Sequence, residues 1–172
     1  ASAKTVQGRF IQTRSTKALR APLRMRGEFC MEQGAFAWHI QSPTAFSVVA
    51  RDGVLRQWDA LSDRVTTIDM KRKPSLSALA DAMRSFASGD VASLRPNFHV
   101  ELLDSKTVSL TPKPFHHSAR FLKRILFELD ESRRGIRRIL IEETNGDTTD
   151  IVYVTQRLNE PIPPSQWNVR RK

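Results

Sequence analysis

The feature that most constrains the fold of this chain is a two-residue period. From Gly34 to Gly53 the sequence reads GAFAWHIQSPTAFSVVARDG, and large apolar residues alternate with small or polar ones on both sides of Ser42-Pro43. Alternation of this kind places successive side chains on opposite faces of a β-strand. The stretch therefore predicts two strands, with turns at Ser42-Pro43 and at Asp52-Gly53.

The same period recurs along most of the chain. Further alternating segments lie at 23–32, 54–58, 64–70, 97–103, 106–113, 120–132, 136–143 and 150–158. Asn145-Gly146 is a strong signal for a tight hairpin, and Asp104-Ser105 is a second candidate turn. About ten strands joined by tight turns form an antiparallel meander, and a meander of this length must curl or close to protect its edges.

Two segments have a helical period instead. Residues 1–16 carry a short pattern with Val6 and Phe10 on one side, which predicts a helix or part of one. Residues 74–90 carry a longer apolar stripe, with serines near its start and Gly89 at its end. The stripe consists of Leu76, Leu79, Ala80, Met83 and Phe86. We expect this helix to lie inside the curled sheet or across its mouth, because the stripe needs an apolar surface on which to pack.

Composition limits the class of protein. The 172 residues suffice for one domain, which we expect to span 1–172. The 28 Lys and Arg against 18 Asp and Glu give a net charge of +10, which favours an anionic partner. The single cysteine, Cys30, allows no intramolecular disulfide, and no apolar run is long enough to span a membrane. The chain begins Ala-Ser-Ala without an initiator Met, so we expect a form from which a signal peptide has been removed.

The sequence carries no signature of catalysis. No GxSxG, P-loop, HExxH or dinucleotide-binding motif is present, so we expect no enzyme activity and no cofactor. His116-His117 could bind a metal, but adjacent residues on an extended segment point to opposite sides, so we expect a loop pair and no metal site. Nucleic-acid binding needs aromatic side chains exposed among basic ones. Here the aromatics fall on the apolar faces, and we expect no nucleic-acid partner.

An ordered set of short motifs resembles one known family. The set comprises Phe10-Ile11-Gln12, Gly27-Glu28-Phe29, Phe36-Ala37-Trp38 followed by Pro43, Asp52-Gly53, Trp58-Asp59 and Leu110-Thr111-Pro112-Lys113. Their order and spacing over residues 6–169 resemble the periplasmic outer-membrane lipoprotein carrier proteins, the LolA-like family. The resemblance implies a mainly β protein with few helices (α+β): a half-open, curled antiparallel β-barrel with a helical lid.

The resemblance also implies a function. A protein of this family is a Gram-negative periplasmic carrier that shelters acyl chains in an apolar cavity, without a cofactor. It receives cargo from an inner-membrane exporter and delivers it to an outer-membrane acceptor. Glu32-Gln33-Gly34 stands where the family has Arg-Pro, so the cargo is either a lipoprotein or another lipid. The alternative function is a non-enzymatic regulatory module on the same fold that senses lipid or lipoprotein.

The carrier function assigns roles to two sets of apolar residues. The candidate lining of the cavity is Met25, Phe29, Met31, Phe36, Trp38, Ile40, Phe46 and Val48. The candidate lid residues are Leu76, Leu79, Met83 and Phe86. Methionine suits an adaptable wall. The alternative interpretation is an ordinary core, because an alternating face and an amphipathic helix pack in this way by default.

Basic residues concentrate in two parts of the chain, 4–26 and 120–138. They either dock the protein on an anionic membrane surface or an acidic partner, or form a solvated outer face of a monomer. We expect Arg133, Arg134, Arg137 and Arg138 to contribute to attachment to anionic vesicles.

Overall fold

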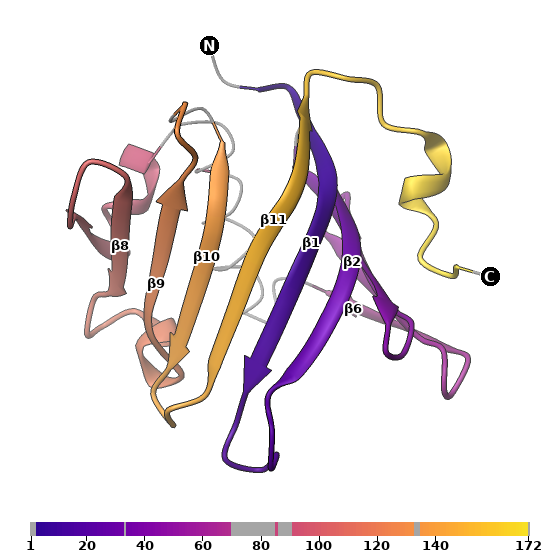
Figure 1. Cartoon of the computed structure of the whole chain (residues 1–172), viewed down its shortest axis with the longest axis horizontal. Coiled ribbons are helices and arrows are strands. Elements are labelled where there is room, and N and C mark those ends of the chain that lie inside the picture. The colour runs from indigo at the N-terminus through magenta and orange to yellow at the C-terminus, as the bar shows by residue number, and fades with distance from the viewer. Residues whose placement is uncertain (1–2, 33, 70–84, 86–90, 133–134, 172) are drawn as a thin grey trace.

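The computed structural model describes residues 3–32, 34–69, 85, 91–132 and 135–171 (Figure 1). Within these residues eleven strands form one sheet. The first six strands are β1 (Thr5–Ser15), β2 (Leu23–Glu32), β3 (Ala35–Ser42), β4 (Phe46–Arg51), β5 (Val54–Asp59) and β6 (Arg64–Asp69). The other five are β7 (Phe98–Leu102), β8 (Thr107–Pro112), β9 (Leu122–Leu129), β10 (Ile136–Glu143) and β11 (Thr148–Leu158). Short 3-10 helices follow β6, β8 and β11, as η2 (Val91–Leu94), η3 (His117–Arg120) and η4 (Pro164–Trp167).

The strand order is β6-β5-β4-β3-β2-β1-β11-β10-β9-β8-β7, and every pair is antiparallel. The first and last strands, β1 and β11, are therefore neighbours in the middle of the sheet. In Figure 1, β11, β1 and β2 run side by side at the front, and the sheet curves back toward β6 on one side and β8 on the other. Strands β6 and β7 are the two edges of the described sheet, so the curl is half-open. The predicted mainly β fold with a half-open, curled antiparallel sheet is confirmed, whereas the helical lid stays a prediction.

Three of the predicted hairpin turns are present, and their side chains explain them. In the β4–β5 turn Asp52 and Gly53 both have positive φ, 54° and 75°, as a tight hairpin requires. Gly146 has φ 91° in the β10–β11 turn. In the β7–β8 turn the Asp104 carboxylate accepts hydrogen bonds from the N–H groups of the second and third residues after it, at 2.8 and 2.9 Å. Such a bond holds the chain in a turn without help from the rest of the fold.

The helix predicted within residues 1–16 is wrong, because this segment forms β1. Its residues pair with β2 on one side and with β11 on the other, so β1 is a central strand of the sheet. The side chains of Val6 and Phe10 do share a face, as expected, but in a strand rather than in a helix. The predicted helix at 74–90 lies outside the described residues except for Ser85, and with it the candidate lid residues Leu76, Leu79, Met83 and Phe86.

The curled sheet has a continuous apolar core on its inner face. The buried members of this core are Val6, Phe10, Phe29, Leu94, Phe98, Leu110, Leu122, Ile125, Phe127, Ile139 and Ile151. The outer face carries a much smaller buried cluster, formed by Cys30, Ala37 and Val49. Within the described part of the chain, no helix is long and apolar enough to cross a membrane.

Candidate functional site

Four aromatic side chains from neighbouring strands form a layer on the inner face. The Phe10 ring on β1 stacks on the Trp38 ring on β3, with centroids 3.7 Å apart and planes 21° apart. Phe29 on β2 lies between them in the strand order and contacts Tyr153 on β11 at 4.7 Å. Aromatic pairs in these arrangements add attraction beyond the area they bury. The layer therefore forms a rigid apolar floor across β3, β2, β1 and β11.

The stack of Phe10 on Trp38 requires a glycine on the strand between them. Gly27 on β2 pairs directly with Phe10 on β1. A Cβ at Gly27 would lie 2.6 Å from Cζ of the Phe10 ring and 2.1 Å from the carbonyl oxygen of His39. Both distances are shorter than van der Waals contact, so the ring occupies the space that any other residue at position 27 would need.

The apolar floor continues across the other half of the sheet. Ile139 on β10 pairs with Phe127 on β9, and Ile125 on β9 pairs with Leu110 on β8. None of these four side chains is more than 1% exposed. Phe98 from β7 completes the floor near the second edge at 3% exposed. The inner face is therefore apolar over most of its width.

The eight residues predicted to line a cavity share this inner face. The register places Phe29, Trp38 and Val48 side by side across β2, β3 and β4. It pairs Met31 with Phe36, and Ile40 with Phe46, on the same face. Phe29 and Met25 are buried, and the other six are half-buried. Contact of these residues with a ligand stays a prediction.

Sequence reasoning missed the half of the floor that β1, β9, β10 and β11 supply. The sequence pattern predicts a helix for Phe10, and it does not place Tyr153, Phe127 or Ile139 among the candidate lining residues. The signal was present in the segment 150–158, where Ile151 and Tyr153 alternate with exposed residues. What was missing was the pairing of β1 with β11, which joins the two ends of the chain into one surface.

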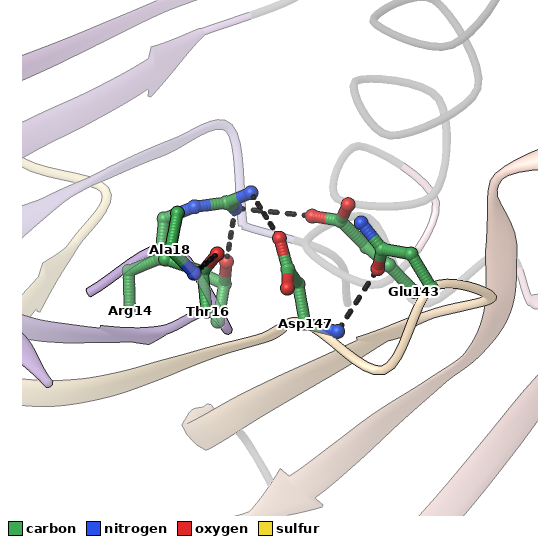
Figure 2. Close-up of polar contacts among 7 residues, drawn as sticks. Arg14, Thr16, Ala18, Glu143 and Asp147 are labelled. Carbon is green, nitrogen blue, oxygen red and sulfur yellow. Dashed lines mark hydrogen bonds and ion pairs between the residues drawn. The ribbon is translucent and has the colours of Figure 1, made fainter. Parts of the chain in front are cut away.

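The inner face becomes polar at the end of the sheet that carries the β1–β2 and β10–β11 turns (Figure 2). Arg14 donates from Nη1 to Glu143 Oε1 at 3.0 Å and to Thr149 Oγ1 at 3.1 Å, and from Nη2 to Asp147 Oδ2 at 3.4 Å. The Asp147 backbone N–H donates to the Asn145 side chain, which holds the turn in shape. Asp147 is only 8% exposed. One cation and two carboxylates thus border the apolar floor at this end.

The C-terminal tail, residues 159–171, covers part of the outer face. The Gln7 side chain donates to the carbonyl of Pro161 at 3.0 Å, and the Arg51 guanidinium lies 5.4 Å from the centre of the Trp167 ring. Three apolar side chains of the tail pack on the outer-face cluster, namely Ile162, Trp167 and Val169. In Figure 1 the tail leaves β11 and runs outside the sheet, beside β2. The tail thus shields the small outer cluster from water.

Two buried groups beneath the tail have structural roles. His39 is 2% exposed, with Nε2 2.8 Å from the Gln166 carbonyl and Nδ1 2.9 Å from Ser47 Oγ. A carbonyl only accepts, so Nε2 carries the proton and Nδ1 accepts from the hydroxyl. Burial lowers the pKa of His39 and raises the pKa of the Cys30 thiol to about 12. Cys30 therefore stays a thiol and His39 stays neutral at pH 7, in places that solvent does not reach.

The described residues contain no group of three or more His, Cys, Asp or Glu side chains that could hold a metal ion. The two rings of His116 and His117 lie 4.1 Å apart, so the expectation that they point to opposite sides is wrong. The reason is that the chain turns into η3 here, with His116 Nδ1 accepting from Ser118. Burial is the main cause that lowers the pKa of His116, and electrostatic repulsion from the neighbouring His117 is the second.

A polar groove of about 580 Å³ separates the tail from β1 and β11 on the outer face. Its lining includes Arg9, Arg157 and the side-chain amides of Gln7 and Gln166. Glu28 provides a carboxylate at the same wall, and Arg157 is itself paired with a tail residue. The groove is therefore mostly polar, and Phe29 is the residue of the apolar floor that also borders it.

An open, curled antiparallel sheet with an apolar inner face defines a class of half-open β-barrels. The family comparison is specific within that class: residues 1–170 match the family described as "Outer membrane lipoprotein carrier protein LolA". The chain therefore belongs to this family, and the predicted resemblance is confirmed. The comparison with curated protein sequences gave no match.

Two solved structures with TM-scores above 0.5 agree on the fold at low identity. The chain is 13% identical to a chain in the complex of Pseudomonas aeruginosa MucA and MucB, with a TM-score of 0.53 over 95% of this chain and 55% of that one. It is 11% identical to a DUF1329 family protein from Desulfovibrio piger, with a TM-score of 0.52 over 96% and 90%. A LolA superfamily protein from Nitrosomonas europaea is 12% identical over 96% and 90%, with a TM-score of 0.49. The chain spans about half of the MucA/MucB chain that it matches.

Proposed function

We propose that this protein is a non-enzymatic carrier that shelters acyl chains against the inner face of its curled sheet. The observation that carries the proposal is the continuous apolar floor, which runs from Trp38 on β3 to Phe98 on β7 within a sheet whose edge strands have no further partner strand among the described residues. A closed core would only stabilise the fold, whereas a half-open sheet leaves an opening through which an acyl chain can enter. Membership of the lipoprotein carrier family supports the same assignment.

The energetics of transfer explain why such a floor is useful. Burying an acyl chain contributes about 0.8 kcal/mol per CH₂, so a chain of roughly sixteen carbons faces on the order of 12 kcal/mol in water. At about 25 cal/mol per Å², this corresponds to roughly 500 Å² of apolar surface that a carrier must cover. The half-buried residues at the margin of the core are the first apolar surface that such a chain would meet, and among them are Met31, Trp38 and Ile40.

The setting that fits this activity is the bacterial periplasm, between an inner-membrane exporter that loads the carrier and an outer-membrane acceptor that unloads it. The family description, an outer membrane lipoprotein carrier, supports this setting. The cargo is a lipoprotein or another lipid with the same acyl chemistry. The sensing alternative has only the fold likeness to the MucA/MucB complex in its favour, and that match spans about half of the other chain.

The three tryptophans of the chain provide a direct test, because they lie on different faces. Trp38 is on the inner face, whereas Trp58 is paired with Ser47 on the outer face and Trp167 is in the tail. Bromine atoms quench tryptophan fluorescence on contact. A single-chain lipid brominated in its acyl chain should therefore quench a variant that keeps only Trp38, and the quenching should saturate. The matched control keeps only Trp58, which is 6% exposed, and should be quenched much less.

Two results would contradict the carrier function. One is no saturable quenching of a folded protein that retains Trp38. The other is equal quenching of the two single-tryptophan variants, which would mean that the lipid binds without entering the curl. Where quenching saturates as expected, displacement by a lipopeptide or by plain phospholipid identifies the preferred cargo.

A further inference from the structure

Two groups of arginines on the outer face of the sheet differ in whether they have partners. Those on β9 and β10 are each neutralised by a carboxylate on a neighbouring strand. The pairs are Arg124 with Glu142, Arg137 with Glu128 at 3.4 Å, and Arg138 with Asp150 at 2.8 Å. Arg133 and Arg134 lie outside the described residues. The predicted vesicle-binding cluster therefore contains at least two arginines that already have partners within the sheet.

The second group lies on β1 and β2 and consists of Arg9, Arg24 and Arg26, which we call the arginine patch. All three side chains are exposed, and none forms an ion pair with another described residue. Arg24 and Arg26 are two residues apart on one strand and share a face, so their Cα atoms are about 7 Å apart. Arg9 is on the adjacent strand directly opposite Glu28, which places it diagonally from Arg26, about 8 Å away.

The nearest carboxylate along β2 is engaged elsewhere. Glu28 follows Arg26 on the same face and pairs with Arg9 in the register. Its Oε2 lies 4.0 Å from Arg171 Nη1 and 3.5 Å from Gln166 Nε2, both of which belong to the tail. The tail therefore engages this carboxylate, although Glu28 stands opposite Arg9, and Arg24 and Arg26 remain without a carboxylate partner among the described residues.

Exposed apolar side chains lie beside the patch. Ile11 on β1 stands between Arg26 on β2 and Val152 on β11 in the register. Val152 is 37% exposed. The β-bulge in β11 adds Val154, which has no partner on β1 and is 54% exposed. The outer face over β11, β1 and β2, at the front of Figure 1, thus combines free cations with a short apolar strip.

We propose that this face, the arginine patch with Ile11, Val152 and Val154, docks on an anionic lipid headgroup layer. Charge complementarity carries the proposal: arginines without partners gain from phosphate groups, which accept their hydrogen bonds in pairs. The shape decides between a membrane and a protein. Protein interfaces rely on anchor side chains that fill pockets, whereas the groove that Arg9 borders is mostly polar, and Ile11, Val152 and Val154 do not line it. A headgroup layer deforms around a convex surface, and short apolar side chains reach its boundary.

The proposal goes beyond the carrier function, since it concerns the outer face and does not depend on what the inner face binds. Docking in this way would hold the carrier against a membrane and leave the inner face and both sheet edges free to exchange cargo. The two faces can therefore be tested separately.

The test is co-sedimentation with vesicles at low salt. The vesicles contain phosphatidylglycerol and phosphatidylcholine in equal parts, and pure phosphatidylcholine vesicles serve for comparison. The variant replaces all three patch arginines with glutamine. Each arginine near an anionic surface contributes roughly fivefold to affinity, so the triple variant should bind on the order of 100-fold more weakly. Raising the salt concentration should weaken vesicle binding by the wild-type protein strongly. The same change should reduce the residual binding of the variant only slightly.

The matched control removes the same net charge elsewhere. Arg64 on β6, Arg95 after η2 and Arg120 in η3 are exposed and form no ion pair among the described residues. Replacing these three with glutamine should change vesicle binding only slightly. Thermal unfolding of both variants checks that each is folded.

Three outcomes would overturn the proposal. In the first, the patch variant binds vesicles as tightly as the wild-type protein. In the second, the control variant loses as much vesicle binding as the patch variant, which would mean that net charge alone sets the affinity. The third is tighter binding of polyglutamate than of the anionic vesicles, which would assign the patch to an acidic protein. Binding of the brominated lipid should be unchanged in the patch variant, so failure of this proposal and failure of the carrier function give different results.

Discussion

The contact between Gly27 and the Phe10 ring makes a quantitative prediction about stability. In the variant Gly27→Ala the new Cβ would lie 2.1 Å from the His39 carbonyl oxygen, which belongs to the backbone of the neighbouring strand. Carbon and oxygen approach to about 3.3 Å in the closest contacts of this kind between strands. Strands β2 and β3 must therefore separate locally by roughly 1 Å, beyond their ordinary spacing of about 4.8 Å.

The expected cost follows from what this separation breaks. Overpacking of a filled core costs about 1–3 kcal/mol, and each weakened hydrogen bond of the ladder contributes about 1 kcal/mol. Alanine restricts the unfolded chain and so offsets about 0.4–1 kcal/mol. We expect Gly27→Ala to lower the free energy of unfolding by about 2 kcal/mol, which for a chain of this size lowers Tm by about 4–8 °C.

Denaturant unfolding followed by circular dichroism measures this change. Gly53→Ala is the matched control, because a Cβ at Gly53 meets nothing within 4 Å and the only strain is its φ of +75°. Gly53→Asn should recover most of the stability lost there, since asparagine tolerates positive φ, whereas Gly27→Asn should be worse than Gly27→Ala. A Gly27→Ala variant within about 0.5 kcal/mol of the wild-type protein would refute the close approach of Phe10, Gly27 and the β3 backbone.

Three further predictions concern the polar groups around the two faces. Cys30, with its pKa raised to about 12 by burial, should react with thiol reagents only on unfolding, and labelling at the same rate in native and denatured protein would contradict its burial. His39 has a pKa lowered by burial, so the unfolded state binds more protons as the pH falls below about 6.5. The free energy of unfolding should therefore decrease as the pH is lowered through that range, and His39→Asn should make this decrease less steep. An equally steep decrease in the variant would assign the effect to His116, whose pKa is also lowered. Arg14→Gln should lower stability by about 1 kcal/mol by leaving the buried Asp147 without its cation, and an unchanged Tm would make the Arg14 network a surface feature only.

The two-residue period of the sequence was sufficient to predict most of the strands but not the first one, β1. Val6 and Phe10 are four residues apart, and four is both two repeats of a strand and about one turn of a helix. The residue that would have decided between the two is Gly8, which lies between them and has no side chain to reveal the alternation. Only the pairing of this segment with both β2 and β11 makes it a strand. Local pattern could not contain that information.

The sequence pattern also could not show which arginines form ion pairs. The sequence contains Arg9, Arg24 and Arg26 in one basic stretch and Arg137 and Arg138 in another, and nothing local distinguishes the two. The fold does so, because Arg137 and Arg138 form ion pairs with carboxylates on adjacent strands, whereas Arg9, Arg24 and Arg26 form none with a described residue. The contribution of Arg133, Arg134, Arg137 and Arg138 to vesicle binding stays a prediction, with Arg137 and Arg138 already paired within the sheet.

The two faces of the sheet lead to one combined prediction. The inner face is apolar and continuous, whereas the outer face is divided between the tail, which covers its small apolar cluster, and the arginine patch, which stays open. Trp38→Asp would put a charge in the aromatic layer and should abolish binding of a fluorescent acyl-chain probe, an assay that does not use Trp38 as its reporter, while vesicle binding persists. Replacing the patch arginines should do the reverse. If either change affected both assays in a folded protein, the faces would be coupled, and docking and cargo binding would have to be treated as a single event.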